Sequence, residues 1–482
     1  MSNETTPKRR RVVIGGGISG LSAASRLVEL APHDDVLLLE AGPRLGGVLQ
    51  TIRRDGFLVE QSADNFITDV PWATDFCRRA GMGDALLPTA TSNRRALVAH
   101  RGRLEPVPDG FMLLAPSRLW PLLKSPLLSL RAKLRLACEP FVPSRPADAP
   151  EESLAQFTTR RLGREAYERI AAPLVGAIYG GDPALLSVAA ALPRFVEMER
   201  QHGSLLRAAR KISKSRREAA HGAADAAGDG SSGARYGLFV APRDGMSSMV
   251  ETIAARLPPD SVRLNASVAA IERSAGGWRL HLAGENESLA ADAVIIATPI
   301  RAAGKLLDTL DPQAAELCRS VTSSSCAVVS LGYDVRDSEF VPPGFGFVVP
   351  TAENRPILAA SFASAKFPHR APQGHVLARV FVGGVGHEDV LALSDEALKQ
   401  IAVAQLAELA GLRGKPVLSI VSRWPESMPQ YHVGHVDRMQ RLHAKVATLG
   451  PLALAGSAYQ GVGIPQCIRS GEVAAESVLE KY

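Results

Sequence analysis

Four short apolar runs have the pattern of buried parallel strands. They lie at residues 12–14, 36–39, 293–296 and 452–454 and read VVI, VLLL, AVII and LAL. Apolar runs without alternation are typical of strands that are covered on both faces, as in α/β proteins. The first and last runs each lead through glycines into an alanine-rich helical pattern, in VVIGGGISGLSAASRL and in LALAGSAYQGVGIPQCIRSGEVAAESV. The pattern therefore predicts one α/β domain that both ends of the chain build.

Composition and charge narrow the class of protein. The 482 residues, of which 46% are hydrophobic, suffice for two or three domains with large buried cores. The 55 basic and 49 acidic residues leave a net charge of only +6, which is too diffuse for a dedicated nucleic-acid-binding protein. We therefore expect a globular protein without a nucleic-acid partner.

The spacing of the cysteines and the length of the apolar runs indicate the cellular compartment. The five cysteines are far apart and form no C-x-x-C pair, so we expect reduced thiols and no structural metal. No signal-peptide pattern follows MSNETTPKRRR, and no apolar run approaches the roughly 18 residues of a membrane span. The sequence predicts a cytoplasmic protein that neither crosses a membrane nor is secreted.

The first glycine-rich turn is a candidate phosphate cradle. Gly15, Gly17 and Gly20 follow the first apolar strand in G-x-G-x-x-G spacing. Such glycines allow a tight turn, a close approach of backbone to a pyrophosphate, and close packing of helix on strand, while the helix N-terminus supplies free N–H groups. The predicted cradle comprises Gly15, Gly16, Gly17, Ile18, Ser19 and Gly20.

An acidic residue strengthens the prediction of a dinucleotide site. Glu40 ends the second apolar run, DVLLLEA, twenty residues after Gly20. A carboxylate at this position can accept hydrogen bonds from ribose hydroxyls and would repel a 2′-phosphate, so NADP is disfavoured. The alternative, a turn that serves packing only, requires the strand, loop, helix, strand and acid to occur in this order by chance.

A second glycine motif favours FAD over NAD. Arg44, Gly46 and Gly47 follow the acid directly in EAGPRLGGVLQT. This R-x-G-G continuation resembles the second glycine motif of FAD enzymes in the flavin amine oxidase superfamily. Glycines here would let backbone pass close to the cofactor while Arg44 offers charge near the phosphates; a surface turn is the alternative.

Two further segments differ in amino-acid composition from the predicted strands and helices around them. Residues 111–143 are apolar, broken by prolines and interspersed with basic residues, which predicts short amphipathic helices. Two interpretations stay open for them: a core-facing helical lobe with solvated edges, or a peripheral surface that touches a membrane. Residues 213–236 are rich in Ala, Gly and Ser and are predicted to form a flexible surface loop without chemistry.

Several strings together are similar to the protoporphyrinogen and coproporphyrinogen oxidase family. They are ILAASFASAKFPHRAPQGHVLARVFVGG, RWPESMPQYHVGH, GFGFVVP and AYQGVGIPQCI, and they occur in the family's order over nearly the whole chain. The resemblance implies oxidation of a porphyrinogen to a porphyrin in haem biosynthesis, with six electrons removed in three two-electron steps through FAD. Dioxygen is the implied acceptor. Protoporphyrinogen IX is the first candidate substrate, and coproporphyrinogen III is the alternative.

The resemblance also implies which residues line FAD and substrate. Besides the two glycine motifs and Glu40, the FAD-lining positions are Ala41, Ser62, Ala63, Asp64, Asn65, Val268, Trp424, Gly456, Val462, Gly463 and Ile464. The turn at Ser62–Asn65 lacks the glycine and proline of the family pattern. Arg94 or Arg95 would bind a propionate by a bidentate guanidinium, and Gly346, Phe347 and Val348 would form an apolar wall against the macrocycle.

These observations predict an α/β fold: a bipartite Rossmann-like FAD-binding domain with a mixed-sheet substrate domain and a helical lobe. FAD binding is assigned to residues 1–90, 237–300 and 416–482, the entry strand and helical lobe to 91–212, and the substrate-binding domain to 301–415. No catalytic acid–base constellation has supporting spacing, which suits hydride transfer to a flavin. Another flavin amine oxidase and a non-catalytic FAD-binding protein stay as alternatives, and a homodimer is an open expectation.

Overall fold

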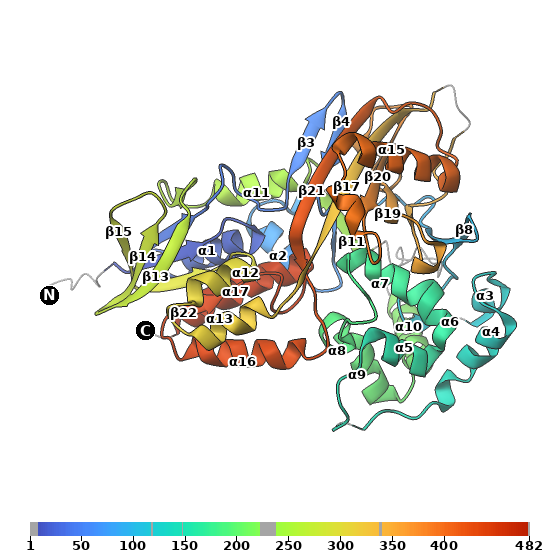
Figure 1. Ribbon diagram of the computed structural model, residues 1–482, viewed down its shortest axis with the longest axis horizontal. Coiled ribbons are helices and arrows are strands. Elements are labelled where there is room, and N and C mark those ends of the chain that lie inside the picture. Colours follow the sequence, from blue (N-terminus) through green and yellow to red (C-terminus); the bar gives the residue numbers. More distant parts are fainter. Residues whose placement is uncertain (1–7, 117–118, 147, 222–237, 337–339, 481–482) are drawn as a thin grey trace.

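The computed structural model describes residues 8–116, 119–146, 148–221, 238–336 and 340–480. Figure 1 shows three regions: a first region that contains the parallel sheet, a large sheet with its own covering helix, and a helical lobe below that sheet. Both ends of the described chain lie in the first region. The predicted α/β class, with a bipartite first domain, a mixed second sheet and a helical lobe, is confirmed.

The central sheet of the first region is parallel throughout and has the order β12-β2-β1-β16-β22. Its strands are β1 (Arg10–Ile14), β2 (Asp35–Leu39), β12 (Val262–Arg263), β16 (Ala293–Ile296) and β22 (Leu452–Leu454). Val12 in the middle of β1 pairs with Leu37 on one side and with Val294 on the other. The four apolar runs of the sequence therefore become neighbouring buried strands.

Helices from opposite ends of the chain cover one face of this sheet. They are α1 (Ile18–Leu30), α2 (Trp72–Arg79), α11 (Met246–Ala254) and α17 (Ile464–Leu479). A Cβ atom at Gly471 on α17 would overlap the carbonyl oxygen of Ser19 and the hydroxyl of Ser22 on α1. The Ser22 hydroxyl in turn donates a 2.8 Å hydrogen bond to the carbonyl of Ile468. The two ends of the chain thus pack backbone against backbone.

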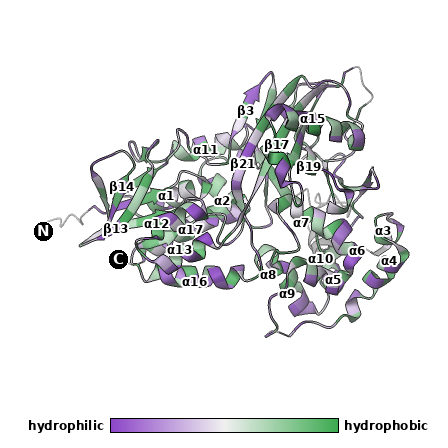
Figure 2. Cartoon of the chain, viewed as in Figure 1, coloured by the Kyte–Doolittle hydropathy of each residue, from purple (hydrophilic) through white to green (hydrophobic). Residues whose placement is uncertain are grey.

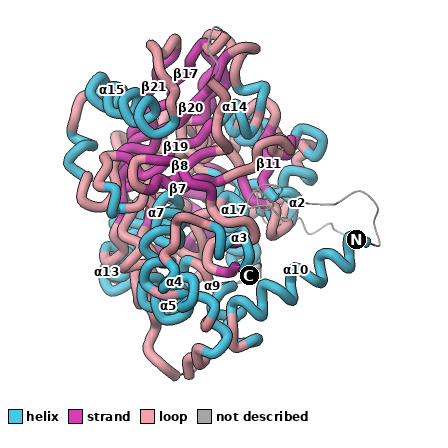
Figure 3. Tube along the Cα trace, turned by 90° about the vertical axis from the view of Figure 1, so that its right-hand side faces the viewer, coloured by secondary structure: helices cyan, strands magenta, loops and turns pink. Residues whose placement is uncertain are grey.

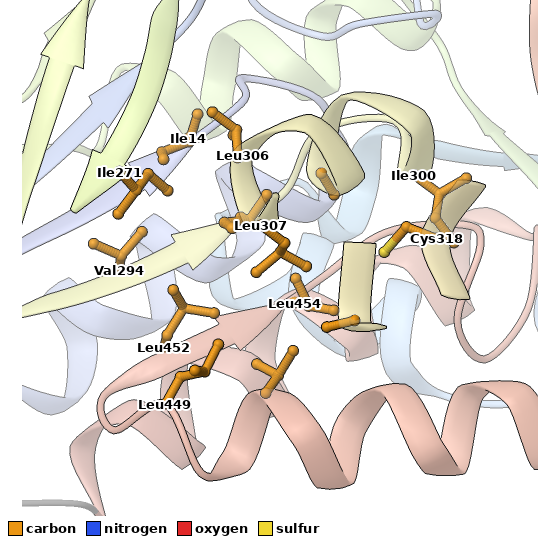
Figure 4. Packing of buried hydrophobic residues seen from close by; sticks show 14 of the residues in the cluster. Ile14, Ile271, Val294, Ile300, Leu306, Leu307, Cys318, Leu449, Leu452 and Leu454 are labelled. Atoms are coloured by element: carbon orange, nitrogen blue, oxygen red, sulfur yellow. The ribbon is translucent and has the colours of Figure 1, made fainter. Parts of the chain in front are cut away.

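A three-stranded antiparallel sheet and three helices cover the other face. They are β13 (Val268–Ser274), β14 (Gly277–Leu282), β15 (Ser288–Ala291), α12 (Ile300–Leu307), α13 (Pro312–Arg319) and α16 (His435–Ala447). Figure 4 shows Leu306 and Leu307 of α12 in one buried cluster with Val294 and Leu452 of the parallel sheet. Residues 301–319, assigned to the substrate domain from the sequence, pack here because the apolar faces of α12 and α13 join this core.

A seven-stranded mixed sheet forms the second region, in the order β21-β17-β20-β19-β18-β7-β8. Its strands are β7 (Ala96–His100), β8 (Arg103–Pro106), β17 (Ser323–Asp334), β18 (Gly346–Val348), β19 (Ile357–Phe362), β20 (His375–Val382) and β21 (Leu418–Pro429). β18 and β7 are parallel and the other neighbours are antiparallel. Strand β21 belongs to this sheet although the sequence boundary at residue 416 assigned it to FAD binding. Helix α15 (Asp395–Gln405) covers one face.

The helical lobe packs on the opposite face of the seven-stranded sheet (Figure 3). Its helices are α3 (Leu119–Lys124), α4 (Leu130–Ala137), α5 (Leu154–Leu162), α6 (Arg164–Ala166), α7 (Ala172–Tyr179), α8 (Val188–Ala191), α9 (Pro193–His202) and α10 (Leu205–His221). Residues 213–221, predicted as the start of a loop, continue α10, and residues 222–236 of that predicted loop lie outside the described residues. An ion pair between Arg161 and Glu139, both fully buried, ties α5 to the segment before residue 142.

Short strands join the regions. The hairpin β3 (Thr51–Arg54) and β4 (Phe57–Glu60) leads into β5 (Phe66–Ile67), which pairs with β11 (Phe239–Pro242) beside β6 (Leu86–Pro88). β9 (Phe111–Met112) and β10 (Ala115–Pro116) form a small ribbon at the lobe. Figure 2 shows hydrophobic and hydrophilic residues alternating on outer helices such as α16. No helix among the described residues is long and apolar enough to cross a membrane.

Candidate functional site

The first glycine turn has no space for a Cβ atom at Gly15 and Gly20. Gly15 follows β1 with φ +106°, and a Cβ there would lie 2.7 Å from the carbonyl oxygen of Ala297, after β16. A Cβ at Gly20 would overlap the carbonyl oxygen of Gly15. Gly17 precedes α1 without a side-chain cap. The first-turn N–H groups of α1 therefore remain available to an anion, as the spacing predicts.

Glu40 holds the two neighbouring turns with its carboxylate. One oxygen, Oε2, accepts a 2.7 Å hydrogen bond from the backbone N–H of Gly16, and the other, Oε1, accepts a 2.7 Å bond from Gly42. The backbone of Glu40 also accepts from Ala266, just before β13, at 2.9 Å. Each carboxylate oxygen has a second lone pair for a ribose hydroxyl. Glu40 thus positions the first turn, in addition to its predicted role as an acceptor of hydrogen bonds from ribose hydroxyls.

The second glycine motif lies directly against the first. The N–H of Gly46 donates a 2.8 Å hydrogen bond to the carbonyl of Gly16, and Gly17 and Gly46 form a parallel bridge. A Cβ at Gly47 would lie 3.3 Å from the Cα of Gly17. The Arg44 guanidinium donates to the carbonyl of Gly47 at 2.6 Å and to that of Leu49 at 3.2 Å. Arg44 therefore shapes this loop with its own donors, a use that the sequence did not predict.

The C-terminal turn reaches the same edge of the parallel sheet. Gly456 follows β22 with φ +146°, and its N–H donates a 3.1 Å hydrogen bond to the hydroxyl of Ser470. Gly463 precedes α17 without a side-chain cap, and Ile464 is buried in the core under α1. Val462 instead packs on the core of the helical lobe. The turn therefore bridges the parallel sheet and the lobe.

The connection between β4 and β5 contains Ser62, Ala63, Asp64 and Asn65. It has no regular structure, and residues of the seven-stranded sheet hold its backbone. The indole N–H of Trp424 donates to the carbonyl of Gln61 at 2.8 Å, and Arg379 donates to the carbonyl of Ser62. The predicted residues Trp424 and Ser62–Asn65 are thus neighbours although they come from different regions.

Asp64 is the centre of a buried charge cluster that the sequence analysis missed. Its Oδ2 atom lies 3.2 Å from Lys366 Nζ, 3.3 Å from Arg379 Nη1 and 3.6 Å from Arg370 Nη1. Burial alone would raise the pKa of Asp64, but Lys366, Arg379 and Arg370 together hold this pKa well below its usual value. A charged residue inside the apolar strand sequence HVLARVFV was the available signal, since charges are rarely buried without a partner.

The candidate substrate residues divide between the two faces of the large sheet. Val348 faces the helical lobe, whereas Phe347 is 2% exposed in the core under α15, because neighbouring strand residues point to opposite faces. Gly346 pairs with Ser361 at the start of β18. Of these three residues, only Val348 has a side chain on the face that the lobe covers. Phe347 packs on the opposite face, under α15.

The two candidate arginines have different surroundings. The guanidinium of Arg94 donates to the carbonyl of Ala90 at 2.7 Å and to that of Thr89 at 2.9 Å. Arg95 is exposed, and within the described residues its guanidinium has no hydrogen bond or ion pair. The backbone carbonyl of Arg95 accepts from Phe345 at 2.9 Å, which places Arg95 beside the GFGFVVP loop. The guanidinium donors of Arg94 thus bind carbonyls of its own loop, whereas those of Arg95 bind no other described residue.

Comparisons with known proteins agree with this arrangement. Residues 18–479 match the family model described as flavin containing amine oxidoreductase. The chain is 32% identical over 478 residues to coproporphyrinogen III oxidase of Bacillus subtilis (strain 168), with 98% of each chain covered. It is 30% identical over 492 residues to chloroplastic protoporphyrinogen oxidase of Nicotiana tabacum, covering 98% of this chain and 86% of the relative. A crystal structure from Exiguobacterium sp. 255-15, described as a candidate protoporphyrinogen oxidase, has a TM-score of 0.85 at 31% identity and covers 98% of this chain and 100% of the other.

Replacing Glu40 by glutamine tests the dinucleotide site. The amide of Glu40→Gln would set an N–H donor against the N–H of Gly16 or Gly42, so we expect the apoprotein to bind FAD about tenfold or more weakly. Equilibrium dialysis with flavin fluorescence measures the dissociation constant. Glu29→Gln, on the exposed side of α1, is the matched control and should bind FAD as the wild type does. Equal affinities in both variants would contradict the role of Glu40.

Proposed function

The chain belongs to the flavin-containing amine oxidoreductase family and is an FAD-dependent oxidoreductase, and from this premise we propose that it oxidises a porphyrinogen to a porphyrin. The observation that carries the proposal is similarity over almost the whole chain to enzymes named for porphyrinogen oxidation. The bacterial relatives support coproporphyrinogen III as the substrate, ahead of the protoporphyrinogen IX placed first from the sequence. The plant relatives keep protoporphyrinogen IX as the second candidate.

The residues at the carboxyl edge of the parallel sheet fit FAD. Two closely packed glycine turns, an uncapped helix N-terminus and the carboxylate of Glu40 suit a pyrophosphate and a ribose. When bound, FAD accepts two electrons per step as a hydride, and dioxygen is the proposed acceptor that restores it. The turns at Ser62–Asn65 and Gly456–Ile464 would flank the flavin, and the helical lobe and large sheet would orient the macrocycle and exclude water.

Arg95 is the proposed propionate anchor. Its exposed guanidinium, beside the GFGFVVP loop, is free to form two charge-assisted hydrogen bonds with a carboxylate. Arg94 has a supporting role, since its donors already bind the carbonyls of Thr89 and Ala90. This assignment separates two residues that the sequence alone left equivalent.

We also propose that the lobe contacts the surface of an anionic membrane. Leu122 and Leu136 face the core, while Trp120, Leu134 and Phe141 are 67%, 62% and 82% exposed. The segment is therefore apolar on two sides. The exposed basic residues Lys124 and Arg131 belong to the same two helices, α3 and α4, whereas Arg135 binds backbone carbonyls of α5. Apolar side chains interspersed with cations complement the interface of an anionic bilayer.

A porphyrin fluorescence assay tests the proposed activity. Purified FAD-loaded protein, under air, is given coproporphyrinogen III or protoporphyrinogen IX at equal concentration. We expect porphyrin to form faster than in a protein-free control, and faster from coproporphyrinogen III. Rates equal to the control for both substrates would reject the proposal, and a preference for protoporphyrinogen IX would select the second candidate.

Alanine variants separate the roles of the two arginines. Arg95→Ala should raise KM about 10- to 100-fold with little change in kcat, because a charge-assisted pair contributes about 1.5–3 kcal/mol to binding. Arg94→Ala should instead lower the melting temperature, since two backbone carbonyls lose their donors. Steady-state kinetics and thermal unfolding on both variants provide the readouts. An unchanged KM in Arg95→Ala would remove the anchor assignment.

Vesicle flotation tests the membrane contact. At low salt the protein should float with phosphatidylglycerol vesicles and much less with phosphatidylcholine vesicles, because the attraction is partly electrostatic. Leu134→Glu should abolish flotation. Val417→Glu, at a residue 57% exposed on the large sheet, is the matched control and should float normally. A wild-type protein that does not float would show that the exposed face has another purpose.

A further inference from the structure

Three cations of the large sheet and its connections converge on one carboxylate of the nucleotide-binding region. Lys366 ends the short helix α14 (Ala363–Lys366), Arg370 ends the following turn, and Arg379 lies in the middle of β20. All three meet Asp64, and Arg370 also donates a 2.6 Å hydrogen bond to the Asp64 carbonyl. Arg370 and Arg379 are at most 1% exposed. The cluster is therefore a buried junction of the two regions.

Positive charge exceeds negative charge in this cluster. Against three cations stand Asp64 and Glu60, whose Oε1 atom lies 3.6 Å from Arg370 Nη2. Burial raises the pKa of Glu60, which weakens its contribution as an anion. The neighbouring rings add no anion: the guanidinium carbons of Arg370 and Arg379 lie 4.4 Å from the ring centre of Phe367 and 5.4 Å from that of Phe381.

Parts of both guanidinium groups make no hydrogen bond. The Nε and Nη1 atoms of Arg370 and the Nε atom of Arg379 are buried without a hydrogen bond. Buried cations without full compensation are costly, and apolar residues of similar size would commonly be as stable or more so. Support of the Ser62–Asn65 turn alone would not require three cations. The excess charge therefore points to a function besides packing.

We propose that Lys366, Arg370 and Arg379 act on bound FAD, fixing the Ser62–Asn65 turn beside the flavin and raising the flavin's reduction potential through their net positive charge. The inference rests on the proposed function, which places this turn beside the flavin. Each oxidation step would break one C–H bond of the porphyrinogen and pass its two electrons and proton to FAD as a hydride, while one further proton leaves the macrocycle to solvent. Reduced FAD then carries one more negative charge, which nearby cations stabilise.

The cycle closes with the proposed acceptor. Dioxygen takes the two electrons and the proton from reduced FAD together with one proton from solvent, which gives hydrogen peroxide and oxidised FAD. The cations favour the first half of this cycle, in which FAD gains charge. They are positioning residues, since their contacts are with the turn.

Two substitutions that change the net charge of the cluster in opposite directions provide the test. Spectroelectrochemical titration measures the two-electron midpoint potential of FAD in the holoprotein at fixed pH. Lys366→Met should make reduction about tenfold less favourable, a shift of about 30 mV to lower potential. Asp64→Asn, which removes an anion, should shift the potential upward. Lys366→Arg should retain the wild-type value, and Lys399→Met, on the outer helix α15, is the matched control and should be unchanged.

A merely structural cluster would give a different result. Lys366→Met and Asp64→Asn would then shift the potential in the same direction or leave it unchanged, and either outcome overturns the inference. If thermal unfolding shows that Lys366→Met is not folded, Lys366→Gln makes the same charge change with a polar side chain. The potential is measured without porphyrinogen, so protein that holds FAD but oxidises no porphyrinogen would reject the proposed function and leave this result readable.

Discussion

Parallel pairing on both sides of β1 is the constraint on which the site depends. Because β2, β1, β16 and β22 run in one direction, their carboxyl ends meet at one edge, and each delivers a turn there. The N–H of Gly15 binds the carbonyl of Leu39 at the end of β2, and the N–H of Ala297 binds that of Ile14. Four segments that are far apart in the sequence therefore form one continuous backbone surface. At Gly15, Gly20 and Gly46 a neighbouring carbonyl leaves no space for a side chain.

The second organising feature is the hold of the large sheet on the Ser62–Asn65 turn. Trp424, Arg379, Arg370 and Lys366 all bind this irregular connection, so its conformation is set from outside the domain to which it belongs. A flavin enzyme of this kind needs few reactive side chains, since its cofactor carries the redox chemistry. What the protein must provide is geometry and electric field. The same buried groups can supply both, which explains why charged residues occupy positions that apolar ones could fill.

Local sequence patterns made much of the parallel sheet and its glycine turns predictable. The glycine spacing, the acid after the second strand and the unbroken apolar runs follow from requirements within about 40 residues of chain, and the structure brings those residues together. Interactions over long separations were not predictable. Asp64 and Lys366 are 302 residues apart, and no local sequence pattern around either residue indicates that the two form an ion pair. The cores that residues 301–319 and strand β21 join were not predictable for a related reason, since the sequence of an amphipathic helix or an edge strand does not indicate which core it packs against. Strand alternation, by contrast, could have placed Phe347 and Val348 on opposite faces.

The contact of Gly471 with α1 also has a consequence for biosynthesis. Ser22 and Ile468 are 446 residues apart, and at the usual pace of translation the ribosome needs roughly 20 to 90 seconds to make the chain between them. Throughout that time the buried face of α1 lacks its partner helix, and the nascent nucleotide domain stays incomplete. The packing of α17 on α1 can therefore form only after α17 has been synthesised. Loss of the last turns of α17 would leave apolar residues of α1 and of the parallel sheet exposed to solvent.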